Sequence, residues 1–190
     1  TQDEVLRREM RLFEGAPTSD DRIQNSKVRL ERLGYFKDVT VETIPVPNTD
    51  DQVDVVYQVE EETTGQIGGN VGYSDFGIML GFNLNERNFL GSGNTVGVSI
   101  NKSIYQESYN LSFFDPYFTM DGVSRGYNVY FRETDYGEFN IANYLTNSAG
   151  LGLQFGYPIS DTQRIGLNIT YDKTDIDSGT LPAREISDFL

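Results

Sequence analysis

The sequence contains no cysteine and no histidine among its 190 residues. The chain therefore has no thiolate nucleophile, no imidazole base and no Cys/His metal site, which excludes most familiar enzyme chemistries. We accordingly predict that the protein is not an enzyme, and we assign no catalytic residue, no metal ligand and no cofactor. The absence of cysteine is compatible with a reducing and with an oxidising compartment, so it does not identify the location.

Long apolar runs are also absent. No run approaches the roughly 18 apolar residues of a helical membrane span, and the first residues lack the basic and apolar regions of a signal peptide. The sequence thus predicts no membrane-spanning helix and no retained signal peptide. The mean hydropathy of −0.45 does not exclude membrane insertion, because a transmembrane strand carries polar residues on its lumenal face.

Basic residues are scarce relative to acidic ones. The chain has 15 Lys and Arg against 29 Asp and Glu, which gives a net charge of −14. This balance argues against a nucleic-acid partner, since nucleic-acid binding requires a basic face. Residues 1–62 and 63–190 each carry a net charge of −7, so the acidity marks no single binding patch.

Glycine and aromatic residues divide the chain near residues 62–65. Only Gly15 and Gly34 of the 19 glycines precede residue 63, and so do only four of the 24 Phe and Tyr residues. We therefore predict two domains: an α+β module over residues 1–62 and an all-β region over residues 63–190.

Apolar residues at helical spacing predict a first helix at the start of the module. Thr1 and Glu4 form a capping-box pattern, and Gly15 is expected to end the helix. The predicted apolar stripe consists of Leu6, Met10 and Phe13.

A second helix is predicted from about Ser19 to Leu33, and a two-stranded hairpin with alternating valines follows over residues 39–42 and 53–59. Two strands cover two helices poorly, and about 60 residues lie near the lower limit for an independent core. We therefore expect a further strand of this sheet, most simply one that precedes Thr1.

From Gly65 onward, apolar and polar residues alternate with a period of two in seven successive segments. One parity carries bulky apolar residues such as Leu80, Leu111 and Leu167, whereas the other is rich in Gly, Asn and Ser. Segments of about nine to eleven residues match the length of a tilted strand that crosses a bilayer. The pattern favours an antiparallel transmembrane β-barrel, with about seven strands of a larger barrel in this chain.

A soluble β-sandwich interaction domain is the alternative, because its strands alternate as well. A solvated sheet face is typically rich in Lys, Glu and Thr, which the polar parity here is not. The two folds differ in one testable respect. In a sandwich, Leu80, Leu111 and Leu167 would lie buried together between two stacked sheets.

Five sequence motifs resemble the BamA family of bacterial outer-membrane β-barrel assembly factors. The matching residues are 5–11 with 14–16, 31–36, 51–57, 88–93 and 115–124. The resemblance implies that residues 1–62 form a partial POTRA domain and that residues 63–190 form the N-terminal part of a transmembrane β-barrel. It also implies location in the bacterial outer membrane with the module in the periplasm, and extracellular loops at residues 133–147 and 172–190.

The resemblance further implies a function, the assembly and insertion of β-barrel proteins by pairing of client strands with the first barrel strand, which forms a lateral gate. Glycine weakens the packing and register of such a strand, although glycine also relieves crowding in a tilted barrel wall. The predicted pairing edge consists of Gly65, Gln66, Ile67, Gly68, Gly69, Asn70, Val71, Gly72, Tyr73 and Ser74.

The partners implied by the resemblance are client outer-membrane β-barrel proteins, the BAM lipoproteins and outer-membrane lipid. Arg7, Arg8 and Glu14 are the candidates for docking the lipoprotein BamD, although exposed charges on a solvated helix face are the simpler interpretation. An alternative function is a secretion pore of the same superfamily, of the two-partner or autotransporter-assembly type.

Overall fold

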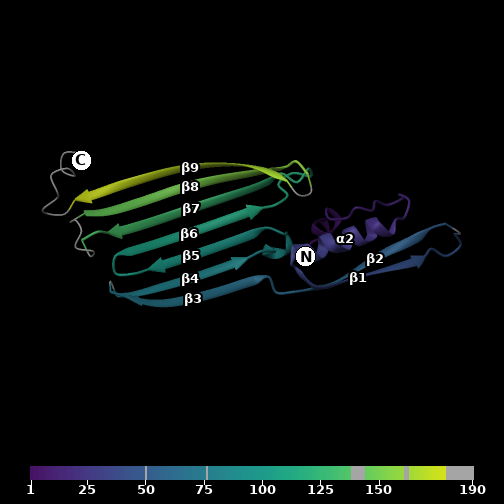
Figure 1. The fold of residues 1–190 in the computed structure, drawn as a ribbon, viewed down its shortest axis with the longest axis horizontal. Helices are drawn as coiled ribbons and strands as arrows, with labels where there is room; N and C mark the ends of the chain where they lie inside the picture. The colour runs from purple at the N-terminus through teal and green to yellow at the C-terminus, as the bar shows by residue number, and fades with distance from the viewer. Residues whose placement is uncertain (50, 76, 138–143, 161–162, 179–190) are drawn as a thin grey trace. The chain divides into compact units, whose positions relative to one another are not determined.

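The computed structural model describes residues 1–190 except residues 50, 76, 138–143, 161–162 and 179–190. The described chain divides into two compact units, which are coloured from purple to yellow along the sequence in Figure 1. The first unit, called the module below, comprises Thr1–Thr64 together with Arg87–Gly93. The second, called the sheet unit, comprises Gly65–Glu86 and Asn94–Leu190. The domain boundary expected between residues 62 and 63 stays a prediction.

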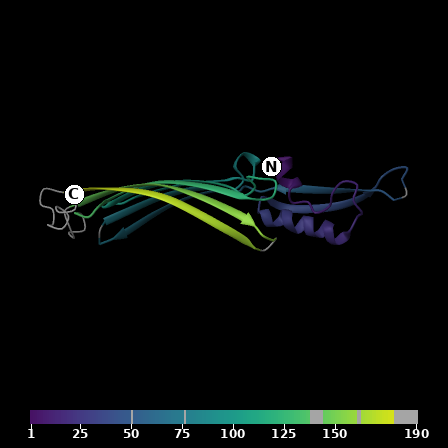
Figure 2. The same cartoon turned by 90° about the horizontal axis from the view of Figure 1, so that it is seen from above.

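The module consists of two helices, a two-stranded antiparallel sheet and the connector Arg87–Gly93. Its buried core contains Val5, Leu30 and Val39 together with the rings of Tyr35 and Phe36. Figure 2 shows the longer helix running along one face of the hairpin. The element bounds are α1 Asp3–Arg7, α2 Asp20–Leu33, β1 Phe36–Pro45 and β2 Val53–Glu61.

Helix α2 follows the prediction to within one residue. Asp20 and Asp21 lie in its first turn, where negative charge is favourable next to the helix N-terminus. Ile23 and Leu30 are buried, and Gly34 ends the helix in the left-handed conformation with φ 66°. The predicted hairpin is also confirmed, because Val39 lies opposite Val59 across β1 and β2.

The predicted first helix is wrong in length and in its cap. Helix α1 has only five residues, its N-cap is Gln2 without a side-chain cap, and Phe13 is 71% exposed. Contacts with α2 take the place of further helical turns. The Arg11 amide donates to Ser26 Oγ at 2.9 Å, and the buried Glu9 carboxylate pairs with Arg29 at 2.8 Å. Tertiary contacts thus override the helical spacing of the apolar residues.

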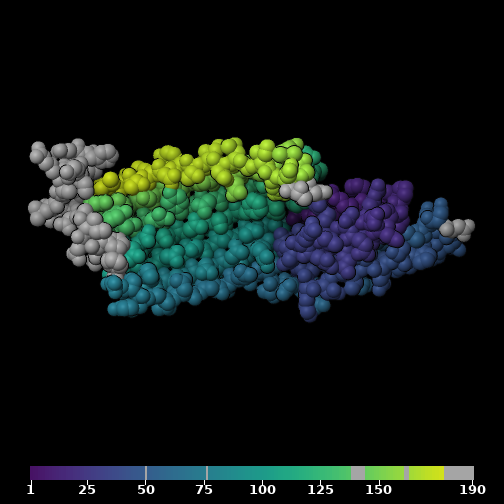
Figure 3. Space-filling model, in the orientation of Figure 1, coloured from purple at the N-terminus to yellow at the C-terminus, as the bar shows by residue number. Residues whose placement is uncertain are grey.

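The sheet unit is one antiparallel sheet whose seven strands lie side by side in sequence order, as the successive colours in Figures 1 and 3 show. The short 3₁₀ helix η1, Phe89–Gly91, lies in the connector between the second and third of these strands. The strand bounds are β3 Gly65–Ser74, β4 Gly77–Glu86, β5 Thr95–Lys102, β6 Gln106–Asp115, β7 Ser124–Asp135, β8 Tyr144–Pro158 and β9 Arg164–Ser178.

The strand register places residues of one kind on each face of the sheet. Side chains in directly opposed positions point to the same face, so a row across the strands samples one face. One row is apolar and consists of Ile67, Leu84, Val98, Leu111, Val129, Leu151 and Tyr171. The adjacent row is polar and consists of Gln66, Asn85, Gly97, Ser112, Asn128, Gly152 and Thr170.

The apolar face is uncovered in the described residues. Leu80, Leu111 and Leu167 are 52%, 53% and 58% exposed, and no second sheet packs on them within the described ranges. The alternative of a β-sandwich is therefore wrong. One face of this sheet is apolar and needs a further apolar phase to cover it. No helix among the described residues is long and apolar enough to span a membrane.

The loops predicted at residues 133–147 and 172–190 begin too early. Glu133 pairs with Asn147 across β7 and β8, and β9 continues to Ser178. A hydrogen-bonded ladder does not require apolar side chains, so the strands continue beyond the segments in which apolar and polar residues alternate. Tyr136 stacks on Tyr144 with ring centroids 4.6 Å apart, which supports this extension. Residues 138–143 and 179–190 of the two predicted loops lie outside the described residues.

A candidate strand-pairing edge

Strand β3 is one of the two terminal strands of the sheet, with β9 at the other end, and its bounds coincide with those of the predicted pairing edge. It pairs with β4 along its whole length, from Gly65 opposite Glu86 to Ser74 opposite Gly77. In the described part of the chain no strand pairs with its other side. A terminal strand presents a row of backbone N–H and C=O groups without ladder partners, which invites pairing with a further strand.

The apolar side chains of β3 are less covered than those of interior strands. Ile67, Val71 and Tyr73 are 75–84% exposed, whereas Leu111 and Leu151 are 53% and 45% exposed. The reason is that a β3 side chain has a neighbouring strand on one side only. The apolar row of the sheet therefore ends in residues that another strand could still cover.

The glycines of β3 have two different physical roles. A Cβ at Gly68 would lie 2.5 Å from Asn83 Nδ2, so this glycine leaves room for the Asn83 side chain. At Gly69 the nearest atom to a built Cβ is the Gly81 carbonyl oxygen at 3.8 Å, which is ordinary contact. Crowding therefore explains Gly68 but not Gly69. At Gly69 the missing side chain weakens packing on the apolar face between Ile67 and Val71.

Strand β8, an interior strand, offers matched positions for comparison. A Cβ at Gly150 would lie 2.4 Å from the Tyr130 ring, so this glycine accommodates a neighbouring side chain. A Cβ at Gly152 would meet Asn128 Cβ at 3.5 Å, again an ordinary contact. Gly69 and Gly152 thus form an edge and interior pair with similar space for a methyl group, Gly69 on the apolar face and Gly152 on the polar face.

The three candidate docking residues of the module do not form one cluster. Arg7 donates from Nε to Asp3 Oδ2 at 2.5 Å and from Nη1 to Glu14 Oε1 at 3.5 Å. The hydrogen bond to Asp3, more than any other interaction, raises the pKa of the exposed Arg7 guanidinium. The Arg8 side chain lies next to Gly93 instead. A Cβ built at Gly93 would be 2.4 Å from Arg8 Nη2. The structure therefore joins Arg7 and Glu14 on one exposed surface and places Arg8 elsewhere.

The sequence analysis did not assign a role to Tyr35 or Asn88. Tyr35 is 7% exposed and donates from its hydroxyl to the Gly93 carbonyl oxygen at 3.1 Å. Asn88 donates from Nδ2 to Thr1 Oγ1 at 2.9 Å. Both residues lie in quoted motifs, but their contacts span 58 and 87 positions of the sequence and no local pattern indicates them.

In the part of the chain that the structure describes, no group of three or more Asp or Glu side chains is placed to hold a metal ion.

An α+β module that leads into an antiparallel sheet with one apolar face and one Gly, Asn and Ser face is the architecture of a POTRA domain followed by an outer-membrane barrel. The family comparisons agree with this class. Residues 88–189 match the Omp85 superfamily domain, and residues 1–62 match POTRA, the surface antigen variable number repeat. The chain belongs to the Omp85 superfamily.

Curated relatives carry the name outer membrane protein assembly factor BamA. The chain is 33% identical over 193 residues to BamA of Neisseria meningitidis serogroup B, which covers 100% of this chain and 24% of that protein. It is 30% identical over 179 residues to BamA of Buchnera aphidicola, covering 94% of this chain and 29% of that protein. The chain thus spans about a quarter of the length of the curated relatives it matches.

Solved structures show the same fold. BamA from Haemophilus ducreyi lacking POTRA domains 1–3 matches with a TM-score of 0.77 and 34% identity, covering 94% of this chain and 34% of that chain. CdiB from Acinetobacter baumannii matches with a TM-score of 0.61 over 97% of this chain and 38% of that chain, but at 16% identity this likeness concerns the fold alone.

These findings confirm the resemblance and the fold class. The chain has an N-terminal α+β POTRA-like piece, and its seven-stranded antiparallel sheet matches part of the BamA barrel. The family is one of non-enzymatic assembly factors of the bacterial outer membrane, whose POTRA domains lie in the periplasm.

Proposed function

We propose that the protein to which this chain belongs assembles β-barrel proteins and inserts them into the outer membrane by pairing a client's terminal strand with β3. The observation that supports this proposal is the position of β3, a glycine-rich strand at the end of the sheet order with one side lacking a strand in the described residues. The clients, the lipid around the sheet and the BAM lipoproteins are its proposed partners.

The free energy that drives pairing comes from the backbone. In hydrocarbon each backbone N–H or C=O without a hydrogen bond costs several kcal/mol. A client strand that adds to β3 satisfies its own edge groups and those of β3 at once. Release must then be possible, and a strand that packs weakly at Gly69 is suited to repeated pairing and release.

For the lipoprotein, we propose that Arg7 and Glu14 form the BamD contact. They are adjacent and their side chains are 69% and 94% exposed, so a partner can reach both. Arg8 lies apart from this pair, and its docking role stays a prediction.

Cross-linking in cells tests the proposal. A cysteine at Val71 is expected to form a disulfide with a cysteine in a client's terminal strand while that client is being inserted. Leu111→Cys is the matched control, because Leu111 has the same parity in β6 and is flanked by β5 and β7. Equal yields at Val71 and Leu111 would count against pairing at β3.

The alternative prediction, a secretion pore of the same superfamily, has no supporting observation of its own. The likeness to CdiB concerns the fold alone at 16% identity and carries no information about activity.

A further inference from the structure

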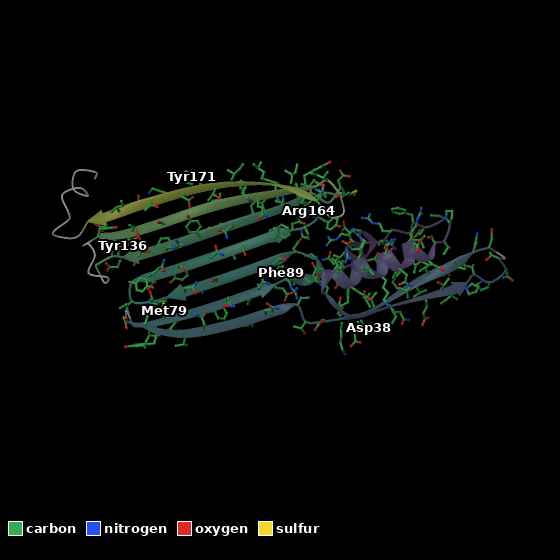
Figure 4. All side chains as sticks on the ribbon, in the orientation of Figure 1. Asp38, Met79, Phe89, Tyr136, Arg164 and Tyr171 are labelled. Carbon is green, nitrogen blue, oxygen red and sulfur yellow. The ribbon has the colours of Figure 1, made fainter. Side chains whose placement is uncertain are left out.

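The connector between β4 and β5, Arg87–Gly93, is part of the module although it interrupts the sheet unit in sequence. We call this connector the strap; Phe89, labelled in Figure 4, lies on it. We propose that the strap holds the open end of the β3–β4 hairpin closed, so that β3 stays paired with β4 while its other edge exchanges partners. The consequence for clients rests on the function proposed above, whereas the consequence for the hairpin does not.

The strap is bound to the start of the chain by main-chain and side-chain hydrogen bonds. The Gln2 amide donates to the Gly91 carbonyl oxygen at 2.8 Å, and Gln2 Nε2 donates to the Leu90 carbonyl oxygen at 3.4 Å. Asn88 Nδ2 donates to Thr1 Oγ1 at 2.9 Å. These contacts attach the strap at three successive points along its length.

Tyr35 attaches the strap to the end of β2. Its hydroxyl donates to the Gly93 carbonyl oxygen, and its own carbonyl oxygen accepts the Glu62 amide at 2.9 Å. Glu62 directly follows β2 and lies three residues before the first residue of β3. The Tyr35 phenol, whose pKa is raised by burial, is protonated at neutral pH and can donate this hydrogen bond. One residue thus connects the chain that enters β3, through its main-chain carbonyl, with the chain that enters β5, through its hydroxyl.

The strap has one specified conformation. The Gly93 amide donates to Asn88 Oδ1 at 2.8 Å, which closes the strap on itself. Leu90 has a φ of 52°, a left-handed conformation that a residue with a Cβ adopts at a cost of about 1 kcal/mol or more. Gly93 has a φ of 74°, a left-handed conformation in which any residue with a Cβ would be strained. Such a conformation persists only where the surrounding contacts determine it.

The strand register shows where the strap acts. The chain passes between the two units at residues 64/65, 86/87 and 93/94. Gly65 lies opposite Glu86, and Glu86 lies opposite Val96, so the register brings all three passages to one end of β3, β4 and β5. A hairpin opens most easily at the end away from its turn, because the turn joins its strands at the other end. The β3–β4 turn follows Ser74, and both chain segments at the opposite end are held in the module.

The strap therefore determines which side of β3 opens. A glycine-rich strand is weakly packed against any neighbour, so β3 could separate from β4 as well as from a strand on its free side. Anchoring residues 64 and 87 in the same module favours retention of the β3–β4 ladder. Partner exchange is then confined to the free side.

Hydrogen exchange of the full-length protein in lipid nanodiscs tests this inference with Tyr35→Phe. The variant removes the hydroxyl bond to Gly93 and keeps the ring in the core. We expect the amides of residues 65–68 and 83–86 to exchange roughly five- to tenfold faster, as for the loss of one buried hydrogen bond. Asn88→Ala, which loosens the strap at a different point, should give the same pattern.

Tyr57→Phe is the matched control. The Tyr57 hydroxyl donates to the Ile23 carbonyl oxygen at 3.5 Å, inside the module but away from the strap. It should leave residues 65–68 and 83–86 unchanged. The inference is overturned if Tyr35→Phe and Tyr57→Phe give the same exchange at these amides.

Cross-linking separates this inference from the proposed function. Leu84 lies opposite Ile67 on β4, near the open end of the hairpin, and is separated from a client by β3 as long as the hairpin is closed. Leu84→Cys should therefore capture a client's terminal strand in the Tyr35→Phe background and not in the wild-type background. Faster exchange without any client capture at Val71 would refute the proposed function but would still support the role of the strap in holding the β3–β4 hairpin closed.

Discussion

The module and the sheet unit bury different kinds of residue. In the module, Val5, Leu30 and Val39 are at most 2% exposed and form a conventional core. In the sheet unit, the buried positions among the described residues are glycines and one serine, while large apolar side chains are exposed. These positions are Gly97, Gly122, Ser124, Gly126, Gly150 and Gly156.

This difference shows that the two units are suited to different surroundings. A core that excludes water from aliphatic side chains is stable in an aqueous compartment. A sheet that leaves one apolar face open gains that stabilisation only when another apolar phase covers the face, as lipid does for a barrel. The same chain thus combines one unit for the periplasm and one for the membrane of its family.

The largest expected effect comes from the core of the module. Leu30 is fully buried, so Leu30→Ala should lower the free energy of unfolding of the module by about 2–5 kcal/mol. Thermal unfolding followed by hydrogen exchange in the full-length protein should show the loss within Thr1–Thr64, with the amides of the interior strand β6 unaffected. If the β6 amides lose protection to the same extent, the module and the sheet unit unfold together.

The faces of the sheet should differ in their tolerance of charge. Leu111→Arg places a charge on the apolar face at mid-strand and is expected to cost about 2–4 kcal/mol near the bilayer midplane. Asn110→Arg, one residue away on the polar face, should cost much less. Reversible unfolding from lipid vesicles in urea measures both. Similar costs for the two variants would mean that the faces do not contact different environments.

The edge should respond to an added methyl group more than the interior does. Gly69→Ala is expected to slow release of a bound client about two- to fivefold, because alanine strengthens a strand by about 0.5–1 kcal/mol relative to glycine. Gly152→Ala has similar space for its Cβ in β8 and should leave client release unchanged. A pulse-chase measurement of client cross-links gives both rates. The same slowing in both variants would point to general stiffening of the sheet.

The smallest expected effect concerns alkaline pH and the module alone. Burial raises the pKa of Tyr35 above its ordinary value of 10.0. The contribution of the Tyr35 hydroxyl to the stability of the module is therefore complete below about pH 10. It is lost as the pH rises through the pKa of the phenol in the folded state. Between pH 9 and pH 11 the melting temperature of the module should fall slightly further in the wild type than in Tyr35→Phe. Parallel curves for the two proteins would show that Tyr35 ionises as freely as an exposed tyrosine.

The sheet was predictable from the sequence because its signal is local and repeated. Alternation at Leu80, Leu111 and Leu167 reports directly on which face each residue occupies, and the register preserves that parity across all seven strands. The strand ends were less predictable, since the ladder between Glu133 and Asn147 continues after the apolar pattern stops.

Long-range contacts set the limit of what the sequence predicted in the module. The spacing of Met10 and Phe13 indicates a longer helix, but the ion pair between Glu9 and Arg29 and the bond from Arg11 to Ser26 determine a different path. The strap was missed for the same reason. Whether the connector Arg87–Gly93 packs with the sheet or with the module depends on a contact with Tyr35, which lies far away in the sequence.

The proposed function requires β3 to form backbone hydrogen bonds with a client strand. Hydrogen exchange of the full-length protein in nanodiscs, with and without a client arrested during insertion, measures this directly. The amides of Gly65–Ser74 that point away from β4 should become at least about tenfold more protected when the client is bound, while those of Gln106–Asp115 should not change. Unchanged protection in β3, with the client demonstrably bound, would contradict the proposed function.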